Sequence, residues 1–528
     1  MPQNKTKNFL LKFKFTIFYI LFLFIMCYLL TKNIAYTNNT ITILIYTVSN
    51  VILVLTFFIF ISKVSNFIKI PLLILIALWL GFDIGYYLIY NTSIQPSNVA
   101  AILTTNKKEV IGLLESIYIK MFLVIAFFSV FTYLSVKELK SVSLKWTFVP
   151  LIVIGCLLFF SRTSVFNKNS VFKQFSLAIG KFPLIFRDIA LVRENSKEID
   201  QINEYVKGNR IMPQGIILDK NKKTPEKIFL IIGESSLSTH YSLYDYEKDT
   251  TPLLTELSNN QSLIFFKNVI SPAPITLLSL RNTLSFATPN NQESLFKYKN
   301  IVELAKNAGY ETVWFSVSGT VIGWHNTETS MIAKTSNISK LLNHKDVGDW
   351  ILIPMMEKAI VNNKKQLFIL HVRGNHMPYD NFDTKDAKYL PGNDVVAKYD
   401  RTIHNTDRYI KRVYDMMKQQ KGLSIMCYFS DHGEVIGKGH GFLSEGNVQF
   451  KVPLIMSSNN TIEMNNMKKT VEEYRSPSGY LNNSNLIYIL SDFMGYSISE
   501  KVKKWGKSEG EFIFHVDGKS YRFKDIKN

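Results

Sequence analysis

Long, almost uninterrupted apolar runs dominate the first third of the chain. Five of these runs come close to the ~20 residues that a helix needs to cross a ~30 Å hydrocarbon core. They are Phe13–Leu30, Ile41–Ile61, Ile70–Leu88, Tyr118–Val136 and the shorter Trp146–Phe160. No small-residue cleavage site follows the first run, so we expect a retained anchor and not a signal peptide. The pattern predicts a transmembrane domain with five spans over residues 1–165.

Lysines concentrate on one side of these runs if the spans alternate in direction. The lysines are Lys5, Lys7, Lys12, Lys14, Lys63, Lys69, Lys137, Lys140 and Lys145. The positive-inside rule makes this side the cytoplasm, so five spans deliver the rest of the chain to the outer side. The loop Asn91–Glu115 is then external, and its Thr105 and Glu109 lie where a lipid head group would be met. An ordinary solvated loop explains these two residues equally well.

Beyond the spans, the pattern changes twice. Residues 166–226 first mix Phe, Leu and Ile with spaced basic residues, which is typical of short helices at a membrane surface. Gly208–Glu226, which contains Pro, Gly and several Lys, is interpreted as a linker. Residues 227–528 then form the outer domain.

In the outer domain, apolar strand-like runs alternate with helical ones. The expected strands are Ile228–Ile232, Thr312–Val317, Gln366–Val372, Ser424–Ser430 and Val452–Met456. The expected helices are Thr276–Phe286, Asp349–Val361, Val396–Gln420 and Asn483–Gly495, with a hairpin at Phe514–Phe523. Alternation of this kind predicts an α/β fold with a central, mostly parallel sheet covered by helices.

Composition and charge narrow the function classes. A net charge of +19 is compatible with nucleic-acid binding. However, fourteen basic and four acidic residues precede Val165, so about half of the net charge belongs to the membrane part. The remainder is diffuse and shows no basic run interleaved with aromatic residues, so we expect no nucleic-acid partner. Cys27 and Cys156 lie in predicted spans and Cys427 in a buried strand, so no disulfide forms within the outer domain.

The candidate chemistry lies where two predicted strands end. Glu234 follows the first strand, and Asp431 and His432 follow the strand Ser424–Ser430. Ligands of open α/β sheets bind at the carboxyl ends of strands, and carboxylate and imidazole groups are the donors that zinc takes in a tetrahedral site. A hydroxyl at the remaining position would lose its proton more easily. Thr276 is the candidate, expected at the N-cap of a helix, where a plain capping role is the alternative.

The histidines divide into candidates and core residues. His376 comes just after the strand Gln366–Val372, at the expected active edge, and His440 lies in a Gly-rich loop that could close over a substrate. His371 lies inside the strand and is interpreted as a core histidine with satisfied hydrogen bonds. His240 is expected on the surface, and His404, with Asp407, on a solvated or packing face of a helix.

These residues together resemble the phosphoethanolamine transferases, inner-membrane enzymes of the alkaline phosphatase superfamily with a sulfatase-like domain. The motifs that carry the resemblance are Gly233-Glu-Ser-Ser, Tyr241-Ser-Leu-Tyr-Asp-Tyr246, Asp249-Thr-Thr-Pro252, Thr276, Gly374-Asn-His376, Ser430-Asp-His-Gly-Glu434 and His440. The resemblance covers nearly the whole chain, because the family has five membrane helices ahead of a periplasmic catalytic domain.

The resemblance implies a role for each candidate residue. Zinc would be held by Glu234, Thr276, Asp431 and His432, with a second zinc or other divalent ion as an option. Thr276 would accept phosphoethanolamine from phosphatidylethanolamine and pass it to lipopolysaccharide, at lipid A or a core sugar. His376 and His440 would hold the phosphoryl oxygens and assist proton transfer. Thr105 and Glu109 are similar to positions that contact the ethanolamine head group. We expect a monomer.

The sequence departs from the family pattern at two places, and two other functions are alternatives to phosphoethanolamine transfer. Many members have Gly where this chain has Asp245, and a basic residue where it has Ser236-Leu-Ser238. These differences leave the metal ligands in place and bear on the acceptor. The rivals are a phosphoglycerol transferase of the lipoteichoic-acid-synthase type and a non-catalytic membrane scaffold with a dead sulfatase-like fold. A sulfatase needs a Cys or Ser in a modification motif, and none of the three Cys is so placed.

Overall fold

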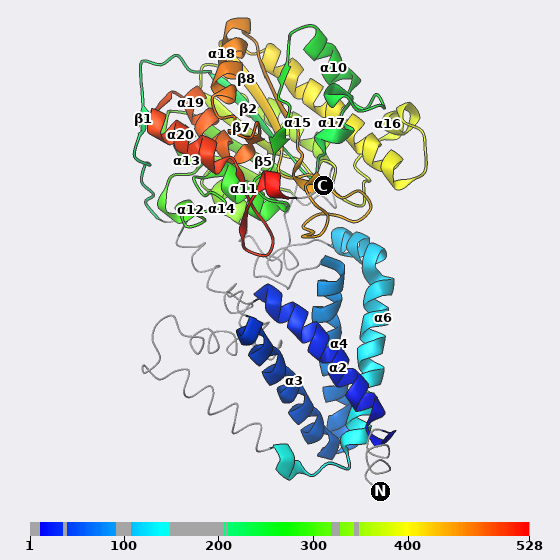
Figure 1. Ribbon diagram of the computed structural model, residues 1–528. Coiled ribbons are helices and arrows are strands. Elements are labelled where there is room, and N and C mark those ends of the chain that lie inside the picture. Colours follow the sequence, from blue (N-terminus) through cyan, green and yellow to red (C-terminus); the bar gives the residue numbers. More distant parts are fainter. Residues whose placement is uncertain are drawn as a thin grey trace. The chain divides into compact units, whose positions relative to one another are not determined.

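The computed structural model describes residues 11–34, 40–90, 107–147, 205, 208–317, 328–342 and 348–526. They belong to two compact units. One unit comprises Met1–Val99 with Ile117–Ser196, and the other comprises Ala100–Ser116 with Lys197–Asn528 (Figure 1). The first unit is helical, and the second carries the sheet.

The helical unit contains four of the five predicted spans as helices. They are α2 (Lys14–Ile34), α3 (Thr40–Lys63), α4 (Asn66–Tyr90) and α6 (Lys107–Leu139), the last of which begins in the other unit. Their buried faces are mostly apolar and include Tyr19, Phe58, Ile84 and Phe128, together with a few small hydroxyl side chains. The fifth predicted span, Trp146–Phe160, lies outside the described residues except for the end of the 3-10 helix η1 (Leu144–Thr147).

Length and composition single out α6 among these helices. Within the described part of the chain, its segment Phe122–Leu139 is the one stretch that is both long and apolar enough to cross a membrane. Lys14–Leu29, Val54–Lys63 and Asn66–Leu78 are apolar but shorter. The predicted number of five spans is therefore not confirmed, although the predicted positions of four helices are.

The α/β unit is organised around a seven-stranded sheet with the order β3-β9-β8-β2-β7-β5-β6. The strands are β2 (Lys227–Gly233), β3 (Ile264–Phe265), β5 (Glu311–Ser316), β6 (Ile338–Leu341), β7 (Gln366–His371), β8 (Ser424–Ser430) and β9 (Leu454–Ser458). The five strands from β8 to β6 are parallel, and β9 and β3 add an antiparallel edge. The predicted mostly parallel sheet is confirmed, and the strand expected at Val452–Met456 is β9, which runs antiparallel to β8.

Two apolar cores cover the two faces of the sheet, because side chains alternate along each strand. In β2, Ile228, Leu230 and Ile232 face one core, whereas Phe229 and Ile231 face the other. The first core is closed by α11 (Thr276–Leu284), α13 (Ile301–Asn307), α14 (Glu328–Lys334), α18 (Thr461–Glu472) and α19 (Leu486–Phe493). The second is closed by α10 (Pro252–Asn259), α15 (Leu352–Ala359) and α17 (Val395–Lys418).

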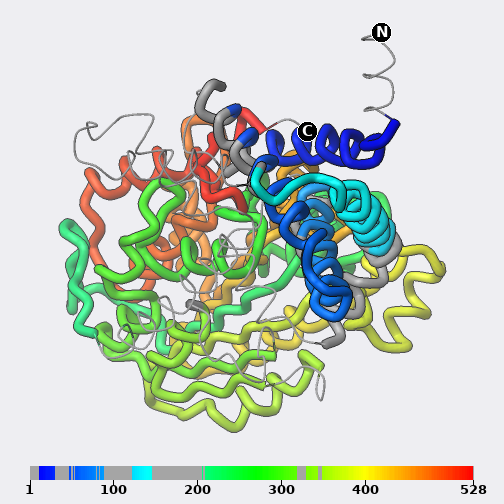
Figure 2. The backbone as a smooth tube through the Cα atoms, turned by 90° about the horizontal axis from the view of Figure 1, so that it is seen from below, coloured from blue at the N-terminus to red at the C-terminus, as the bar shows by residue number. Residues whose placement is uncertain are grey.

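The two helical layers are visible in both views. In Figure 1 the segments that hold α17 and α19, coloured yellow and red, lie on opposite sides of the sheet, and in Figure 2 the same two colours again lie apart. Cys427 is fully buried in β8, as expected of a core residue. The α/β unit is thus a three-layer structure in which β2 lies near the middle.

Short elements complete the unit. They are the strand pairs β1–β11 (Ile216–Leu218 with Tyr496–Ile498), β4–β10 (Val269–Ile270 with Leu481–Asn482) and β12–β13 (Phe512–Phe514 with Ser520–Arg522), and the helices α12 (Ser294–Lys297), α16 (Thr384–Tyr389) and α20 (Glu500–Glu509). The β12–β13 pair is the predicted hairpin, and Gly518 in its turn has φ of +75°. The segment expected as a linker, Gly208–Glu226, contains β1 and so packs against the α/β unit. The apolar run before Thr276 is broken into β3 and β4.

Candidate metal and catalytic site

The ends of three neighbouring parallel strands bring the candidate residues together. Glu234 follows β2, Asp431 and His432 follow β8, and His376 comes a few residues after β7. Because β8, β2 and β7 are adjacent and parallel, their carboxyl ends meet at one edge of the sheet. The backbone ties them there: Asp431 N donates to Gly233 O (3.1 Å), and Asn375 N donates to Glu234 O (2.9 Å).

The loop after β7 approaches Glu234 so closely that only glycine fits. Gly374 has φ of +55°, and a Cβ at this position would lie 2.9 Å from Glu234 O and 3.0 Å from Glu234 N. The buried carboxylate of Asp349 holds this loop by accepting from Arg373 N (2.8 Å) and Gly374 N (3.1 Å). A side chain at position 374 would therefore displace the backbone that presents Glu234.

Thr276 reaches the same place from the first turn of α11. Its Oγ1 lies 3.0 and 3.1 Å from the two carboxylate oxygens of Glu234 and 3.2 Å from His432 Nε2. The helix is anchored to the β8 end by Ser279, whose hydroxyl donates to Asp431 O. The expected N-cap position is wrong by one residue: the N-cap is Ile275, in extended conformation, and Thr276 is the first helical residue. Its hydroxyl points to Glu234 instead of capping its own helix.

The donor set fits a divalent cation. One ligand atom each from Glu234, Asp431 and His432 lie within 4.8 Å of one another, and all three residues are buried. Asp431 Oδ1 accepts from Ser235 N (3.2 Å) and His432 N (2.7 Å). Within the described part of the chain, Asp431 Oδ2 accepts no hydrogen bond, and His432 Nε2 is 3.4 Å away. A buried carboxylate oxygen without a hydrogen bond is costly unless a cation satisfies it.

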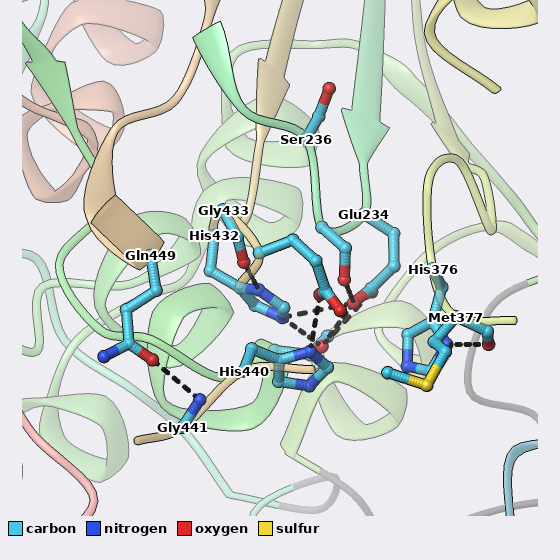
Figure 3. Close-up of polar contacts among 12 residues, drawn as sticks. Glu234, Ser236, His376, Met377, His432, Gly433, His440, Gly441 and Gln449 are labelled. Carbon is cyan, nitrogen blue, oxygen red and sulfur yellow. Dashed lines mark hydrogen bonds and ion pairs between the residues drawn. The ribbon is translucent and has the colours of Figure 1, made fainter. Parts of the chain in front are cut away.

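The imidazole of His432 is also oriented so that one ring nitrogen faces the carboxylate of Glu234. Its Nδ1 lies 2.7 Å from Gly433 O, and since a carbonyl only accepts, Nδ1 carries a proton. Its Nε2 then faces the Glu234 oxygen at 3.1 Å (Figure 3). Two acceptors do not approach this closely unless a proton or a metal ion lies between them. Nitrogen and oxygen donors of this kind suit zinc.

Without a metal, the cluster holds protons tightly. Burial and the nearby Glu234 carboxylate raise the pKa of Asp431. Burial opposes the charge of His432, but Asp431 and Glu234 outweigh it and raise the pKa of His432 to about 10. Both groups bind protons more tightly when folded than when unfolded, so the stability they contribute is present at low pH and is lost as pH rises.

We therefore expect the full-length protein, stripped of metal by a chelator, to lose thermal stability as pH rises from 6.5, the ordinary pKa of histidine, to about 10. Zinc-loaded protein should show the opposite slope toward acid, because protons compete with the metal for the same ligands. Thermal unfolding at a series of pH values, with zinc and with chelator, measures both slopes. Equal slopes under the two conditions would mean that these residues do not bind the metal.

A second group of side chains lies beside the first. His440 Nδ1 lies 3.0 Å from Glu434 Oε2, and the ring centroid of His440 is 4.1 Å from that of His432 and 5.4 Å from that of His376 (Figure 3). His432, Glu434 and His440 also lie close enough to hold a metal ion. However, both oxygens of Glu434 are engaged, since Oε1 accepts from the Tyr379 hydroxyl (2.9 Å). The group containing Asp431 is therefore the better metal site.

Sequence reasoning missed the role of Glu434 and misjudged His371. Glu434 belongs to a motif that carries the family resemblance, and its place two residues after His432 was the available signal. His371 is buried as expected, but within the described residues its Nε2 makes no hydrogen bond, and it lies 4.0 Å from Glu234 Oε2. The prediction of a core histidine with satisfied hydrogen bonds is thus wrong, because the strand register places His371 beside Ile232 and close to the cluster.

The structure shows the surroundings of three more polar residues, His240, His404 and Asp407. His240 is not a free surface residue: its Nδ1 lies 2.9 Å from the buried carboxylate of Asp400. His404 and Asp407 belong to a packing face, since both are buried; His404 contacts Asp386, and Asp407 accepts from the amides of Leu253 and Leu254 at the start of α10.

Two predicted substrate contacts cannot be placed. Thr105 lies outside the described residues, and the side chain of Glu109, in the first turn of α6, is not described. Their predicted role therefore stays a prediction.

The departure at Asp245 has a structural reason. Asp245 has φ of +73°, a conformation that glycine adopts freely and Asp tolerates better than most residues. Its exposed carboxylate lies 2.6 Å from Lys267 Nζ. Asp can therefore occupy this turn without altering the backbone.

An open α/β sheet that gathers carboxylates, an imidazole and a hydroxyl at its carboxyl edge is an arrangement suited to metal-assisted group transfer or hydrolysis. The chain belongs to the sulfatase family, whose match covers residues 226–496. Among curated proteins, it is 26% identical over 413 residues to phosphoethanolamine transferase EptA from Helicobacter pylori, covering 71% of this chain and 74% of the relative.

Solved structures show the same fold. The integral membrane lipooligosaccharide phosphoethanolamine transferase A from Neisseria meningitidis has a TM-score of 0.61 at 17% identity, covering 92% of this chain and 97% of that one. The periplasmic domain of EptC from Escherichia coli, solved in complex with Zn, has a TM-score of 0.52 at 20% identity, covering 60% and 98%. The predicted resemblance to the phosphoethanolamine transferases of the alkaline phosphatase superfamily, and with it the prediction of an enzyme of this class, is confirmed.

Proposed function

We propose that this protein transfers phosphoethanolamine from phosphatidylethanolamine to lipopolysaccharide, at lipid A or a core sugar, through a phosphothreonine intermediate on Thr276. The observation that carries the proposal is the position of the Thr276 hydroxyl, 3.0 to 3.2 Å from Glu234 and His432 at the carboxyl edge of the sheet. A relative that acts on lipooligosaccharide supports the acceptor class.

Glu234, Thr276, Asp431 and His432 would hold one zinc ion. A divalent ion bound there stabilises a deprotonated hydroxyl and neutralises charge on a phosphoryl group, which is worth several kcal/mol in the transition state. Strand ends and a helix N-terminus hold these four side chains. The backbone amides in the first turn of α11 point toward its N-terminus and add a positive electrostatic environment for phosphate. The site thus offers a nucleophile and an anion-binding environment at the same point.

The reaction proceeds in two displacements. In the first, Thr276 Oγ1 forms a bond to the phosphorus of phosphatidylethanolamine, the bond from phosphorus to the glycerol oxygen breaks, and diacylglycerol leaves with a proton. In the second, an oxygen of the acceptor attacks the same phosphorus, and the bond to Thr276 Oγ1 breaks. The threonine regains its proton, so the enzyme is unchanged.

His376 and His440 would bind the phosphoryl oxygens and move these protons. The Nδ1 of His376 is 2.7 Å from Met377 O and that of His440 is 3.0 Å from Glu434 Oε2, so each histidine carries its proton on Nδ1. Burial lowers the pKa of His440, which keeps it neutral and able to accept a proton. Thr105 and Glu109 are proposed to contact the ethanolamine group.

The protein would work in the inner membrane with its catalytic domain, residues 227–528, in the periplasm. The apolar helices and the lysine asymmetry support this orientation. Residues 1–165 would form the multi-pass membrane domain and residues 166–226 the connection. The enzyme would act as a monomer.

Glu434 is proposed to position His440. Replacing it with Gln keeps the shape but loses the charge and one of the two accepted hydrogen bonds, so we expect transfer to slow about 10- to 100-fold at unchanged zinc content. Glu445→Gln, in the same loop but paired with Lys438 at 2.8 Å, is the matched control. An unchanged rate would remove the positioning role, and lost zinc would make Glu434 a ligand.

The test of the proposed function uses full-length protein reconstituted with labelled donor lipids and lipopolysaccharide. We expect diacylglycerol release from phosphatidylethanolamine and a phosphoethanolamine adduct on the acceptor, both measured by mass spectrometry. Glycerol phosphate transferred from phosphatidylglycerol, with no product from phosphatidylethanolamine, would overturn the proposal in favour of the phosphoglycerol transferase. Consumption of neither donor would favour the scaffold.

A further inference from the structure

A basic pocket lies in the helical unit, between the start of α2 and the end of α6. Its volume is about 600 Å³, within the range of small-ligand sites. Lys12 comes from the α2 side, and Lys137 and Lys140 come from the α6 side, together with Phe15 and Leu134. All three lysines are exposed, whereas Phe15 and Leu134 are half-buried. The pocket therefore combines a cationic rim with an apolar wall.

Glu138 is the one acidic residue of this lining, so the lining keeps a net charge of +2. Its Oε2 accepts from Thr16 N (2.8 Å) and the Thr16 hydroxyl (2.8 Å), and its Oε1 accepts from Phe15 N (3.2 Å). The carboxylate thus caps the N-terminus of α2, whose own partial positive charge it neutralises. Within the described residues no ion pair is formed by Lys12, Lys137 or Lys140, so their ammonium groups face a ligand together.

The surface beside the pocket is apolar and continues along both helices. α2 and α6 pack through aromatic rings, with centroids 5.1 Å apart for Phe18 and Phe131 and 4.8 Å apart for Phe22 and Phe127. Phe18 and Val130 are about half exposed on this packed pair. A lipid whose charged head group binds the lysines would place its acyl chains against these apolar side chains.

The ligand follows from this arrangement. The predicted orientation places the start of α2 and the end of α6 at the cytoplasmic surface. There, the negative charge of anionic phospholipids attracts basic side chains. We propose that this pocket binds the head group of one anionic phospholipid of the cytoplasmic leaflet. The phosphate of the lipid bridges Lys12, just before α2, to Lys137 in the last turn of α6 and Lys140 just after it, and so stabilises the α2–α6 pair. This site is independent of the transfer reaction.

Native mass spectrometry of full-length protein tests the proposal, with phosphatidylglycerol as the probe. We expect wild-type protein to retain one phosphatidylglycerol per chain in preference to phosphatidylethanolamine. A triple Lys12/Lys137/Lys140→Gln variant should lose at least about tenfold in retention. The control neutralises three other lysines of the same predicted side, Lys14, Lys69 and Lys145, and should bind as wild type does. Thermal unfolding with added phosphatidylglycerol should shift upward for the wild type and the control but not for the pocket variant.

Two results would overturn the proposal. Equal loss in the pocket and control variants would mean that the lipid follows the overall charge and not a site. Equal retention of phosphatidylethanolamine and phosphatidylglycerol by wild-type protein would mean that the pocket does not select an anionic head group. The exposed lysines contribute little to folding, and an unshifted melting temperature without lipid confirms that the variants are folded.

Discussion

Replacing Thr276 with alanine is expected to abolish transfer, with a loss of about 10⁴-fold or more, because enzymes that lose a covalent nucleophile retain only what binding and electrostatics supply. The hydroxyl lies within 3.2 Å of both Glu234 and His432, so the substitution removes the nucleophile from the point where these two side chains meet. Release of diacylglycerol from labelled phosphatidylethanolamine measures the loss. Zinc should stay bound with reduced affinity, since three ligands remain.

Thr276→Ser is the matched control for this variant. It keeps the hydroxyl and removes only a methyl group, so we expect a measurable fraction of wild-type activity and a phosphoserine peptide in place of the phosphothreonine peptide. An alanine variant that releases diacylglycerol at the native rate would exclude the mechanism. Mass spectrometry of protein quenched during turnover detects the phosphorylated peptide, and so distinguishes loss of the nucleophile from loss of substrate binding.

Replacing Asp431 with asparagine should cost the protein its metal. Loss of an outer partner of a ligand costs about 10- to 100-fold in metal affinity, so loss of a direct ligand should cost more than about 100-fold. Asp431 Oδ2 is buried and makes no hydrogen bond within the described residues, which leaves it for the cation. Elemental analysis and zinc titration of the full-length protein measure the effect. Glu234→Gln should behave in the same way.

Asp407→Asn provides the control for a buried carboxylate elsewhere in the fold. Burial raises the pKa of Asp407 to about 7, and the residue caps α10 instead of facing the cluster. This variant should retain full zinc. Full zinc occupancy in Asp431→Asn and Glu234→Gln would remove both residues as ligands.

The active edge could be predicted because each ligand directly follows an apolar strand. In Ile228–Ile232 and Ser424–Ser430, hydrophobicity marks the strand, and the polar residues after it mark the strand end. Parallel pairing then brings Glu234 and Asp431 to one edge, whatever the rest of the chain does. The helix at Thr276 was predicted from its apolar periodicity and begins at the predicted residue, but Thr276 is its first helical residue and not its N-cap.

Other features depended on contacts between distant residues. The chain alone gave no sign that Glu434 orients His440, that Asp400 binds His240, or that Glu138 caps a helix more than a hundred residues away. Such pairs form because a buried polar group must find a partner wherever the fold supplies one. Hydrophobic periodicity carries no information about that partner.

The sequence by itself therefore determined where the main strands and helices lie along the chain, the apolar character of the first third and the residue types at the strand ends, because these follow from local hydrophobicity and backbone preference. Only the tertiary structure decided that Thr276 Oγ1 lies at hydrogen-bonding distance from Glu234 and His432, that Asp431 keeps a buried oxygen free of hydrogen bonds within the described residues, and that three lysines share one pocket. Strand order and helix packing fix these distances, and neither can be read from spacing along the chain.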